Sequence, residues 1–297
     1  LVVNDKEISD MTGIEDFIAL TELTCQDNQF TSLDLSNNTA LITLRCMNNQ
    51  LTALDVTANT ALTGLYIGGG SQSQISTLDL SNNTALISLN TQDIQTLTSL
   101  DVSANTALTD LGCWNNSLTT LNVNGASSLT YLHCADNQLT SLDVSSNTAL
   151  TNLNCGNNQL TSLDLSANTA LNTLVCHDNQ LTSLDVSANT ALGSFECTAN
   201  QITALDLSNN TELSWFKCGG NQLTTLDVSA NTALTILEFY GNQLTSIDLS
   251  NNTALTNLNC WSNSLTSLDV SANTALTILH CNDNQLTSLD VSANTAL

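Results

Sequence analysis

The chain has 297 residues, of which 27 are acidic and three are basic, so that its formal net charge is −24. A surface of this sign repels nucleic acid and anionic membranes, and we therefore exclude both as partners. No apolar run approaches the roughly 20 residues that a membrane-spanning helix needs, so we expect no membrane insertion.

Most of the chain is one 21-residue unit copied end to end. Counting residues 139–159 as positions 1 to 21, the template is L-x-x-L-D-V-x-x-N-x-x-L-x-x-L-x-C-x-x-N-x, and it recurs to the last residue. Six apolar positions in a unit are too few to form a core alone, so each copy must bury them against its neighbours. Self-similarity at this period predicts a solenoid.

Two triplets in each unit alternate apolar and polar residues. They are Leu-Asp-Val at positions 4 to 6 and Leu-x-Cys at positions 15 to 17. Alternation with period two is typical of a strand with one buried face. We therefore predict a mainly β solenoid with two short parallel strands per coil and little or no helix. The Asn residues at positions 9 and 20 follow these triplets, where their amides can bond the turn and the next coil and a left-handed backbone is tolerated.

This template resembles the leucine-rich repeats of bacterial proteins, in the short nested class where a motif of nearly ten residues occurs twice per coil. The resemblance covers about residues 14 to 297. The run Ile-Ser-Asp-Met-Thr-Gly-Ile-Glu at residues 8–15 is similar to the first repeats of internalin-like secreted proteins. The resemblance implies a secreted or surface-displayed protein used for adhesion or recognition, without naming a partner.

In chain order, residues 1–29 form a degenerate first repeat and residues 30–297 form the regular solenoid. Coils in the range 67–97 are irregular, because the glycine-rich turn after Ile67 is three residues longer than the template. A tolerated surface insertion explains this, since lengthening a loop costs little; a ligand-contacting loop is the alternative. The chain starts without Met or a signal peptide and ends in mid-repeat. We expect the solenoid to continue beyond this fragment and the localisation signal to lie outside it.

All ten cysteines occupy position 17, an inward position. Where Cys is missing, the same position holds Ile67, Thr91 or Phe239, so packing is what it requires. Parallel side chains in register point the same way and rarely reach disulfide torsion, and a linear row cannot converge four ligands on zinc. We predict reduced, buried thiols.

Position 5 is Asp in twelve coils and should face outward. Carboxylates about 5 Å apart repel one another, so something must offset the row. Hydrogen bonds from Ser, Thr or backbone donors, with outward splay of the side chains, are one explanation. Calcium binding is the alternative, since Ca²⁺ takes oxygen ligands. Its candidate ligands are Asp143, Asp164, Asp185 and Asp206.

The outward positions 14, 16 and 18 of the Leu-x-Cys strand carry the variation. All Trp, Tyr and His residues, with Arg45 and Lys217, fall there. Aromatics concentrated on the one diversified face of a repeat protein are typical of a binding site, and random drift is the alternative. We expect the rings of Tyr240 and Trp261 to stack about 5 Å apart. The predicted ligand-binding residues are Trp215, Lys217, Glu238, Tyr240 and Trp261, with Trp114, Tyr131 and His133 as a second patch.

No catalytic motif is present, and identical groups along flat rows do not converge in a pocket, so we predict that the protein is not an enzyme and has no cofactor. The leading hypothesis is a binding module for a protein or carbohydrate ligand. The alternative is a structural spacer that projects another domain from the cell surface.

Overall fold

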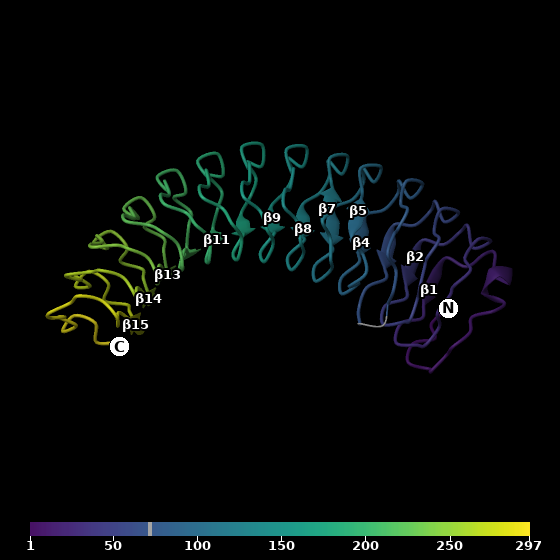
Figure 1. The fold of residues 1–297 in the computed structure, drawn as a ribbon, viewed down its shortest axis with the longest axis horizontal. Coiled ribbons are helices and arrows are strands. Elements are labelled where there is room, and N and C mark those ends of the chain that lie inside the picture. Colours follow the sequence, from purple (N-terminus) through teal and green to yellow (C-terminus); the bar gives the residue numbers. More distant parts are fainter. Residues whose placement is uncertain (71–72) are drawn as a thin grey trace. The chain divides into compact units, whose positions relative to one another are not determined.

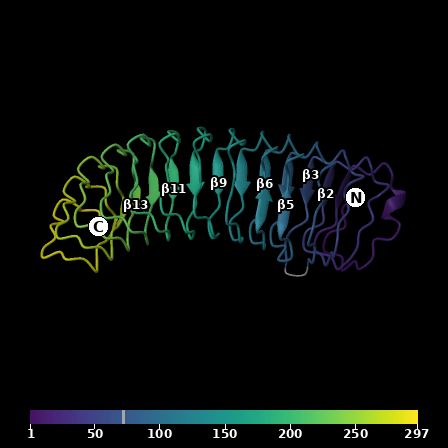
Figure 2. The same cartoon turned by 45° about the horizontal axis from the view of Figure 1, so that its top comes forward.

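The structure is a computed structural model that describes residues 1–70 and 73–297. The chain forms two compact units, residues 1–150 and residues 151–297, and each is described by itself. Every coil contributes a three-residue strand to a parallel sheet, and the rest of the coil is turn and extended backbone (Figures 1 and 2).

The first unit begins with a short 3-10 turn, η1 (Ile14–Asp16). Its main sheet has the order β1-β2-β3-β4-β6-β8. The strands of this unit are β1 (Glu22–Thr24), β2 (Thr43–Arg45), β3 (Gly64–Tyr66), β4 (Ser88–Asn90), β5 (Ser99–Asp101), β6 (Asp110–Gly112), β7 (Thr120–Asn122) and β8 (Tyr131–His133).

The second unit has one sheet in which consecutive strands pair in parallel. Its strands are β9 (Asn152–Asn154), β10 (Thr173–Val175), β11 (Ser194–Glu196), β12 (Trp215–Lys217), β13 (Ile236–Glu238), β14 (Asn257–Asn259) and β15 (Ile278–His280). Among the described residues no helix has the length and hydropathy needed to cross a membrane.

The core is a set of columns that run through the coils of each unit. The central residue of nearly every strand is buried while its two neighbours are partly exposed, as the period of two predicts. Equivalent residues of successive coils pair in register, and the Phe195 and Phe216 rings stack at 5.3 Å. The prediction of a 21-residue β solenoid with almost no helix is confirmed.

The second strand of each coil is the exception. Within the described residues, positions 4 to 6 form a ladder only where β5 pairs with β7. Elsewhere these positions are extended backbone without a ladder, so most coils have one strand and not two. Side chains bond the backbone beside them, since the Val228 carbonyl accepts from the Asn252 amide at 3.0 Å and the Ser229 N–H donates to Asp227 Oδ1 at 2.9 Å. The same kinds of bond lie beside β5 and β7, where the Ser103 N–H donates to Asp101 Oδ1 and the Val123 carbonyl accepts from the Asn147 amide, so they do not decide where the ladder forms.

Two asparagine ladders join the coils, as predicted. At position 20, Asn221 Nδ2 donates to the Cys197 and Cys218 carbonyls, each at 3.0 Å, and its Oδ1 accepts from the Ile202 N–H at 3.0 Å. The left-handed residue, however, is the one before this Asn. Gly220 has φ 63° there, so the tight turn and the ladder use adjacent residues.

The cysteines are all free thiols. Nine are buried and Cys281 is partly exposed. Burial raises the pKa of Cys113 and of Cys155 to about 12, so these thiols stay protonated at neutral pH. The prediction of reduced thiols used for packing is confirmed.

The long turn of the irregular coils 67–97 is shaped by glycine. Gly69 and Gly70 both have φ 89°, and a Cβ on Gly68 would lie 2.0 Å from the Gln92 carbonyl oxygen. Side chains at these positions would be strained or would clash. The two following residues, 71–72, belong to the predicted ligand-contacting loop but lie outside the described residues.

Candidate functional site

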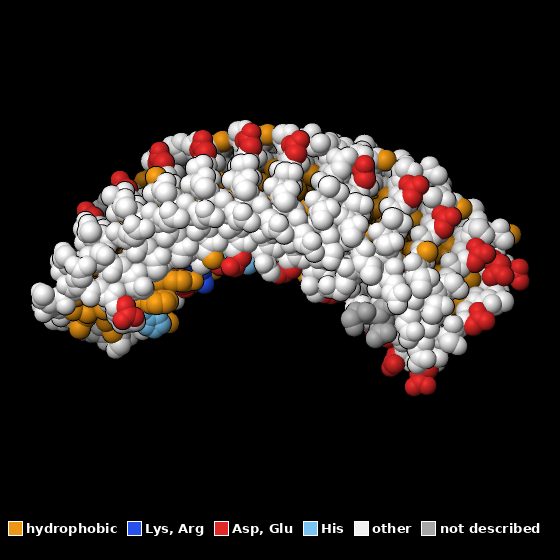
Figure 3. All heavy atoms as spheres, in the orientation of Figure 1, with side chains coloured by type: hydrophobic (Ala, Val, Ile, Leu, Met, Phe, Trp, Pro, Cys, Tyr) orange, Lys and Arg blue, Asp and Glu red, His pale blue; other side chains and the backbone are white. Residues whose placement is uncertain are grey.

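The variable residues of the second unit gather on the solvent side of its sheet. Figure 3 shows hydrophobic, basic and histidine side chains, with some acidic ones among them, on one edge of the coils drawn green to yellow in Figure 1, and a row of acidic side chains with some hydrophobic ones along the opposite edge. The strand register accounts for this, because positions 14 and 16 flank a buried residue and so point outward.

We call the group of Trp215, Lys217, Glu238, Tyr240 and Trp261 the aromatic patch. The structure brings all five onto neighbouring coils. The Tyr240 and Trp261 rings stack with centroids 5.4 Å apart and an interplanar angle of 9°, which confirms the predicted spacing. Trp261 is 37 % exposed, so the stack is open to solvent.

The charged members of the aromatic patch bind each other. Lys217 and Glu238 are register partners on β12 and β13, and Lys217 Nζ lies 3.3 Å from Glu238 Oε1. The same ammonium group lies 4.7 Å from the centre of the Trp215 ring. A cation is thus held between an aromatic face and a carboxylate.

The orientation of the Tyr240 ring depends on the absence of a side chain at Gly219. A Cβ on this glycine would come within 2.5 Å of Tyr240 ring carbons, so the ring covers the preceding coil. Burial raises the pKa of the Tyr240 hydroxyl, and the carboxylates of Glu238, Glu196 and Asp178 raise it further, so the hydroxyl remains protonated and can donate.

Sequence reasoning missed two members of this surface. Ile278, which is 43 % exposed, occupies position 14 on β15, and the half-buried Ile236 has the same position on β13, with Asn257 between them. Gly219 is the other missed member. The signal for Ile278 was its outward position, whereas the contact of Gly219 with Tyr240 joins residues one coil apart.

The second predicted patch is also brought together, within the first unit. The Trp114 and His133 rings stack at 4.5 Å and 17°, and Tyr131 meets His133 edge-on at 6.4 Å. Gly112 makes room for Trp114, since a Cβ there would lie 2.5 Å from the indole. Burial lowers the pKa of His133, which therefore is neutral at neutral pH.

A third cluster in the first unit was not predicted as a site. Arg45 forms an ion pair with Glu22 at 3.1 Å, and its guanidinium lies 4.8 Å from the centre of the Tyr66 ring. Exposed ion pairs of this kind add little to stability. The arrangement repeats the aromatic, cation and carboxylate combination of the aromatic patch.

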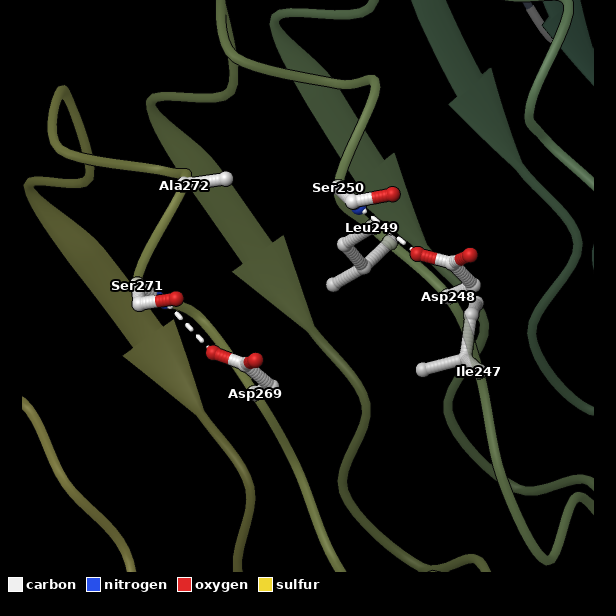
Figure 4. A pocket seen from close by; sticks show the side chains of 7 residues that line it. All are labelled: Ile247, Asp248, Leu249, Ser250, Asp269, Ser271 and Ala272. Atoms are coloured by element: carbon white, nitrogen blue, oxygen red, sulfur yellow. Dashed lines mark hydrogen bonds between the residues drawn. The ribbon is translucent and has the colours of Figure 1, made fainter.

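The aspartate row lies away from the sheet, and its repulsion is offset as the first explanation predicts. Ser250 donates its N–H to Asp248 and Ser271 donates its N–H to Asp269, each at 2.9 Å and each within one coil, and the two pairs line a cavity between these coils (Figure 4). Hydrogen bonds from the Ser250 side chain and backbone lower the pKa of Asp248. No group of three or more His, Cys, Asp or Glu in the part of the chain that the structure describes could hold a metal ion. Calcium binding stays a prediction.

Comparisons with known proteins agree with this geometry. Residues 127–168 match the family described as Leucine Rich repeats (2 copies). A search among curated protein sequences found no match. The fold and the repeat define the chain as a leucine-rich-repeat solenoid.

Solved structures of leucine-rich-repeat proteins show which members of this class the chain resembles. The functional domain of InlJ from Listeria monocytogenes, which includes a cysteine ladder, is 37% identical with a TM-score of 0.80, over 94% of this chain and 66% of that one. This chain thus spans about two thirds of that domain. The internalin InlF of Listeria monocytogenes is 27% identical with a TM-score of 0.74, over 100% of this chain and 84% of that one. A Leptospira interrogans leucine-rich-repeat protein, 21% identical with a TM-score of 0.78 over 100% of this chain and 88% of that one, shares the fold. The chain is an internalin-like bacterial leucine-rich-repeat protein.

Proposed function

We propose that this chain is a binding module, secreted or displayed on a bacterial cell surface, that holds a protein partner on the aromatic patch. The observation that carries the proposal is the contiguity of the patch. Residues that stand 21 positions apart in the sequence form one exposed surface with stacked rings, an ion pair and flanking isoleucines. Exposed aromatics next to satisfied polar groups are what interface hot spots consist of.

The ring arrangement favours a protein over a carbohydrate. A sugar ring stacks on a free aromatic face, but one face of Tyr240 covers Gly219 and the other is turned to Trp261. What Tyr240 offers to a partner is its edge and its hydroxyl. Protein side chains can pack against such edges and against the neighbouring Ile278, which is exposed.

The similarity to InlJ and InlF supports a binding role on the outside of a bacterium. The site itself supports binding without catalysis. Lys217 and Glu238 neutralise each other, His133 is stacked on Trp114, and the buried thiols are protonated. None of these groups is placed to act as a nucleophile or as a general base.

The test uses the full chain and its Tyr240→Ala, Trp261→Ala double variant. Both are screened against an array of secreted and cell-surface proteins and against a glycan array. Loss of one hot-spot aromatic costs about 2 kcal/mol, or roughly thirtyfold in affinity. We therefore expect protein hits that the double variant binds at least thirtyfold more weakly, while its far-ultraviolet circular dichroism and melting temperature stay unchanged.

Ile87→Ala is the matched control, because Ile87 is an apolar side chain that is 47 % exposed in the other unit. It should bind like the wild type. Protein hits that bind the double variant with full affinity would refute the aromatic patch as the binding site. Hits confined to the glycan array would show that the ligand is a carbohydrate and not a protein. An absence of hits on both arrays would favour the alternative that the chain is a structural spacer.

A further inference from the structure

The second unit is strongly acidic. Residues 151–297 include twelve Asp or Glu and one basic residue, Lys217. This one cation is already bound to Glu238 on the sheet face. The field that a partner meets on approaching this unit is therefore negative.

Glu196 leaves a carboxylate beside the aromatic patch. The register places Glu196, Lys217 and Glu238 side by side on β11, β12 and β13. Lys217 lies between two carboxylates, and its ion pair is with Glu238. No ion pair joins Glu196 to another side chain of residues 1–70 and 73–297, so its charge is available to a partner.

The ring of Tyr240 brings the aromatic patch to this carboxylate. Because the ring covers Gly219, it extends over the preceding coil, and its hydroxyl feels the charges of Glu196 and Asp178. The patch thus has two different ends. One end, toward β10 and β11, carries Glu196 and the paired Asp178 and His177, and the other, toward β14 and β15, exposes Trp261 and Ile278 with His280 and Asp283 beside them.

The protein itself shows how a cation binds on this face. Lys217 places its ammonium group 4.7 Å from the centre of an indole ring and 3.3 Å from a carboxylate. A Lys or Arg side chain of a partner can lie on the same face with its aliphatic stem against an aromatic edge and its charge at Glu196.

From this charge complementarity we propose that the partner bound on the aromatic patch presents a basic segment, in which a Lys or Arg pairs with Glu196 and an apolar or aromatic side chain about four residues away, the reach of three strand spacings, packs on Trp261. The inference rests on the proposed function and names the chemistry of its partner. An acidic segment is repelled from this face, and an uncharged one gains nothing from Glu196.

The experiment selects binders from a displayed library of random 12-residue peptides on the full wild-type chain, and sorts them by loss of binding to the Tyr240→Ala, Trp261→Ala variant. The expected patch-dependent peptides are enriched in Lys or Arg about four residues from an aromatic or aliphatic residue. Their affinity should fall as salt is raised, and Glu196→Gln should weaken it about tenfold. Asp206→Asn is the matched control, because it removes the same charge from the opposite edge of the unit and should change the affinity less than twofold.

The outcomes separate the two proposals. Patch-dependent peptides that are neutral or acidic would overturn the basic partner and leave the binding site standing. Equal effects of Glu196→Gln and Asp206→Asn would reduce the charge effect to long-range steering and would also overturn it. Peptides that all bind the double variant as tightly as the wild type would refute the aromatic patch as a protein-binding site.

Discussion

The two asparagine ladders should contribute unequally to stability, and a pair of substitutions in the second unit tests this. Asn221 at position 20 and Asn231 at position 9 are both buried, at 7 % and 0 % exposure. Residue type and location give no reason to expect different contributions, because both residues are Asn in a turn. Their hydrogen bonds differ, and we predict that Asn221→Ala destabilises the chain much more than Asn231→Ala.

The magnitudes follow from the groups left behind. Asn221→Ala removes two donor bonds of 3.0 Å, to the Cys197 and Cys218 carbonyls, and a longer one of 3.3 Å to the Gly219 carbonyl, and it leaves the buried Ile202 N–H without an acceptor. An orphaned buried N–H costs about 1–3 kcal/mol and each lost bond about 1 kcal/mol, so the total is about 3–5 kcal/mol.

The same accounting for Asn231 gives a small number. Its Nδ2 donates to the Leu207 and Asn210 carbonyls at 3.1 and 2.8 Å, but each carbonyl keeps a backbone N–H donor, and the buried Oδ1 has no partner within the described residues. Removing an unsatisfied acceptor offsets part of the loss, so we expect about 1 kcal/mol or less. The coil that starts at Leu118 already has Ala126 at this position.

Urea unfolding of the full chain measures the difference, with hydrogen exchange of the Ile202 amide as a local readout. In Asn221→Ala this amide should exchange faster, because its acceptor is gone, whereas in Asn231→Ala it should not change. Because each coil is stabilised by its neighbours, the urea midpoints of two variants are compared only where the dependence of the unfolding free energy on urea has the same slope. Equal losses of stability in the two variants, or an unchanged Ile202 amide, would refute the accounting.

Three further predictions concern the thiols, the aspartates and the stacked rings. Thiol titration in denaturant without reductant should find ten free thiols, and five disulfides would contradict this. Titration of the folded chain at neutral pH should find few reactive thiols, because burial raises the pKa of Cys155 to about 12. Hydrogen bonds from Ser229 lower the folded pKa of Asp227 below its ordinary value of 3.8, so this stabilisation is present above about pH 4 and is lost as the pH falls through the folded value. Melting temperatures should fall with acidification below pH 4, less steeply in Asp227→Asn, and parallel curves would contradict the assignment. Gly219→Ala should displace the Tyr240 ring and weaken the near-ultraviolet dichroism of the Tyr240 and Trp261 stack. Gly193→Ala should not, because its Cβ would meet nothing closer than the Asn172 side chain at 3.3 Å. An unchanged spectrum in Gly219→Ala would count against the covered-glycine geometry.

Much of the fold could be predicted because each structural feature recurs at a fixed position. The Leu and Cys residues at positions 15 and 17 required an inward column, and the structure has one in each unit. The second strand could not be excluded in this way. Its Leu-Asp-Val alternation is real, but a buried face does not require a ladder. Leu226 and Val228 are buried in a coil whose positions 4 to 6 form no strand.

The candidate site could be predicted as a face but not as a surface with two ends. Register alone placed Tyr240 beside Trp261, because equivalent positions lie one coil apart. The direction in which the Tyr240 ring leans depends on the empty space above Gly219, and this lean is what brings its hydroxyl toward Glu196. The direction of a side chain that extends over a neighbouring coil depends on the residue 21 positions away. The pattern of residues within one coil does not contain this information.

That dependence is itself a pattern in the sequence of this protein. Position 18 is Gly156 in one coil and His177 in the next, and again Gly219 followed by Tyr240; in both pairs a Cβ on the glycine would come within 3 Å of the following ring. In a solenoid whose other positions repeat, such a pair allows a bulky ring to extend over the preceding coil without disturbing the core below it. The proposed binding surface therefore depends on pairs of residues at this variable position, and the glycine of each pair shapes the surface as much as the ring that covers it.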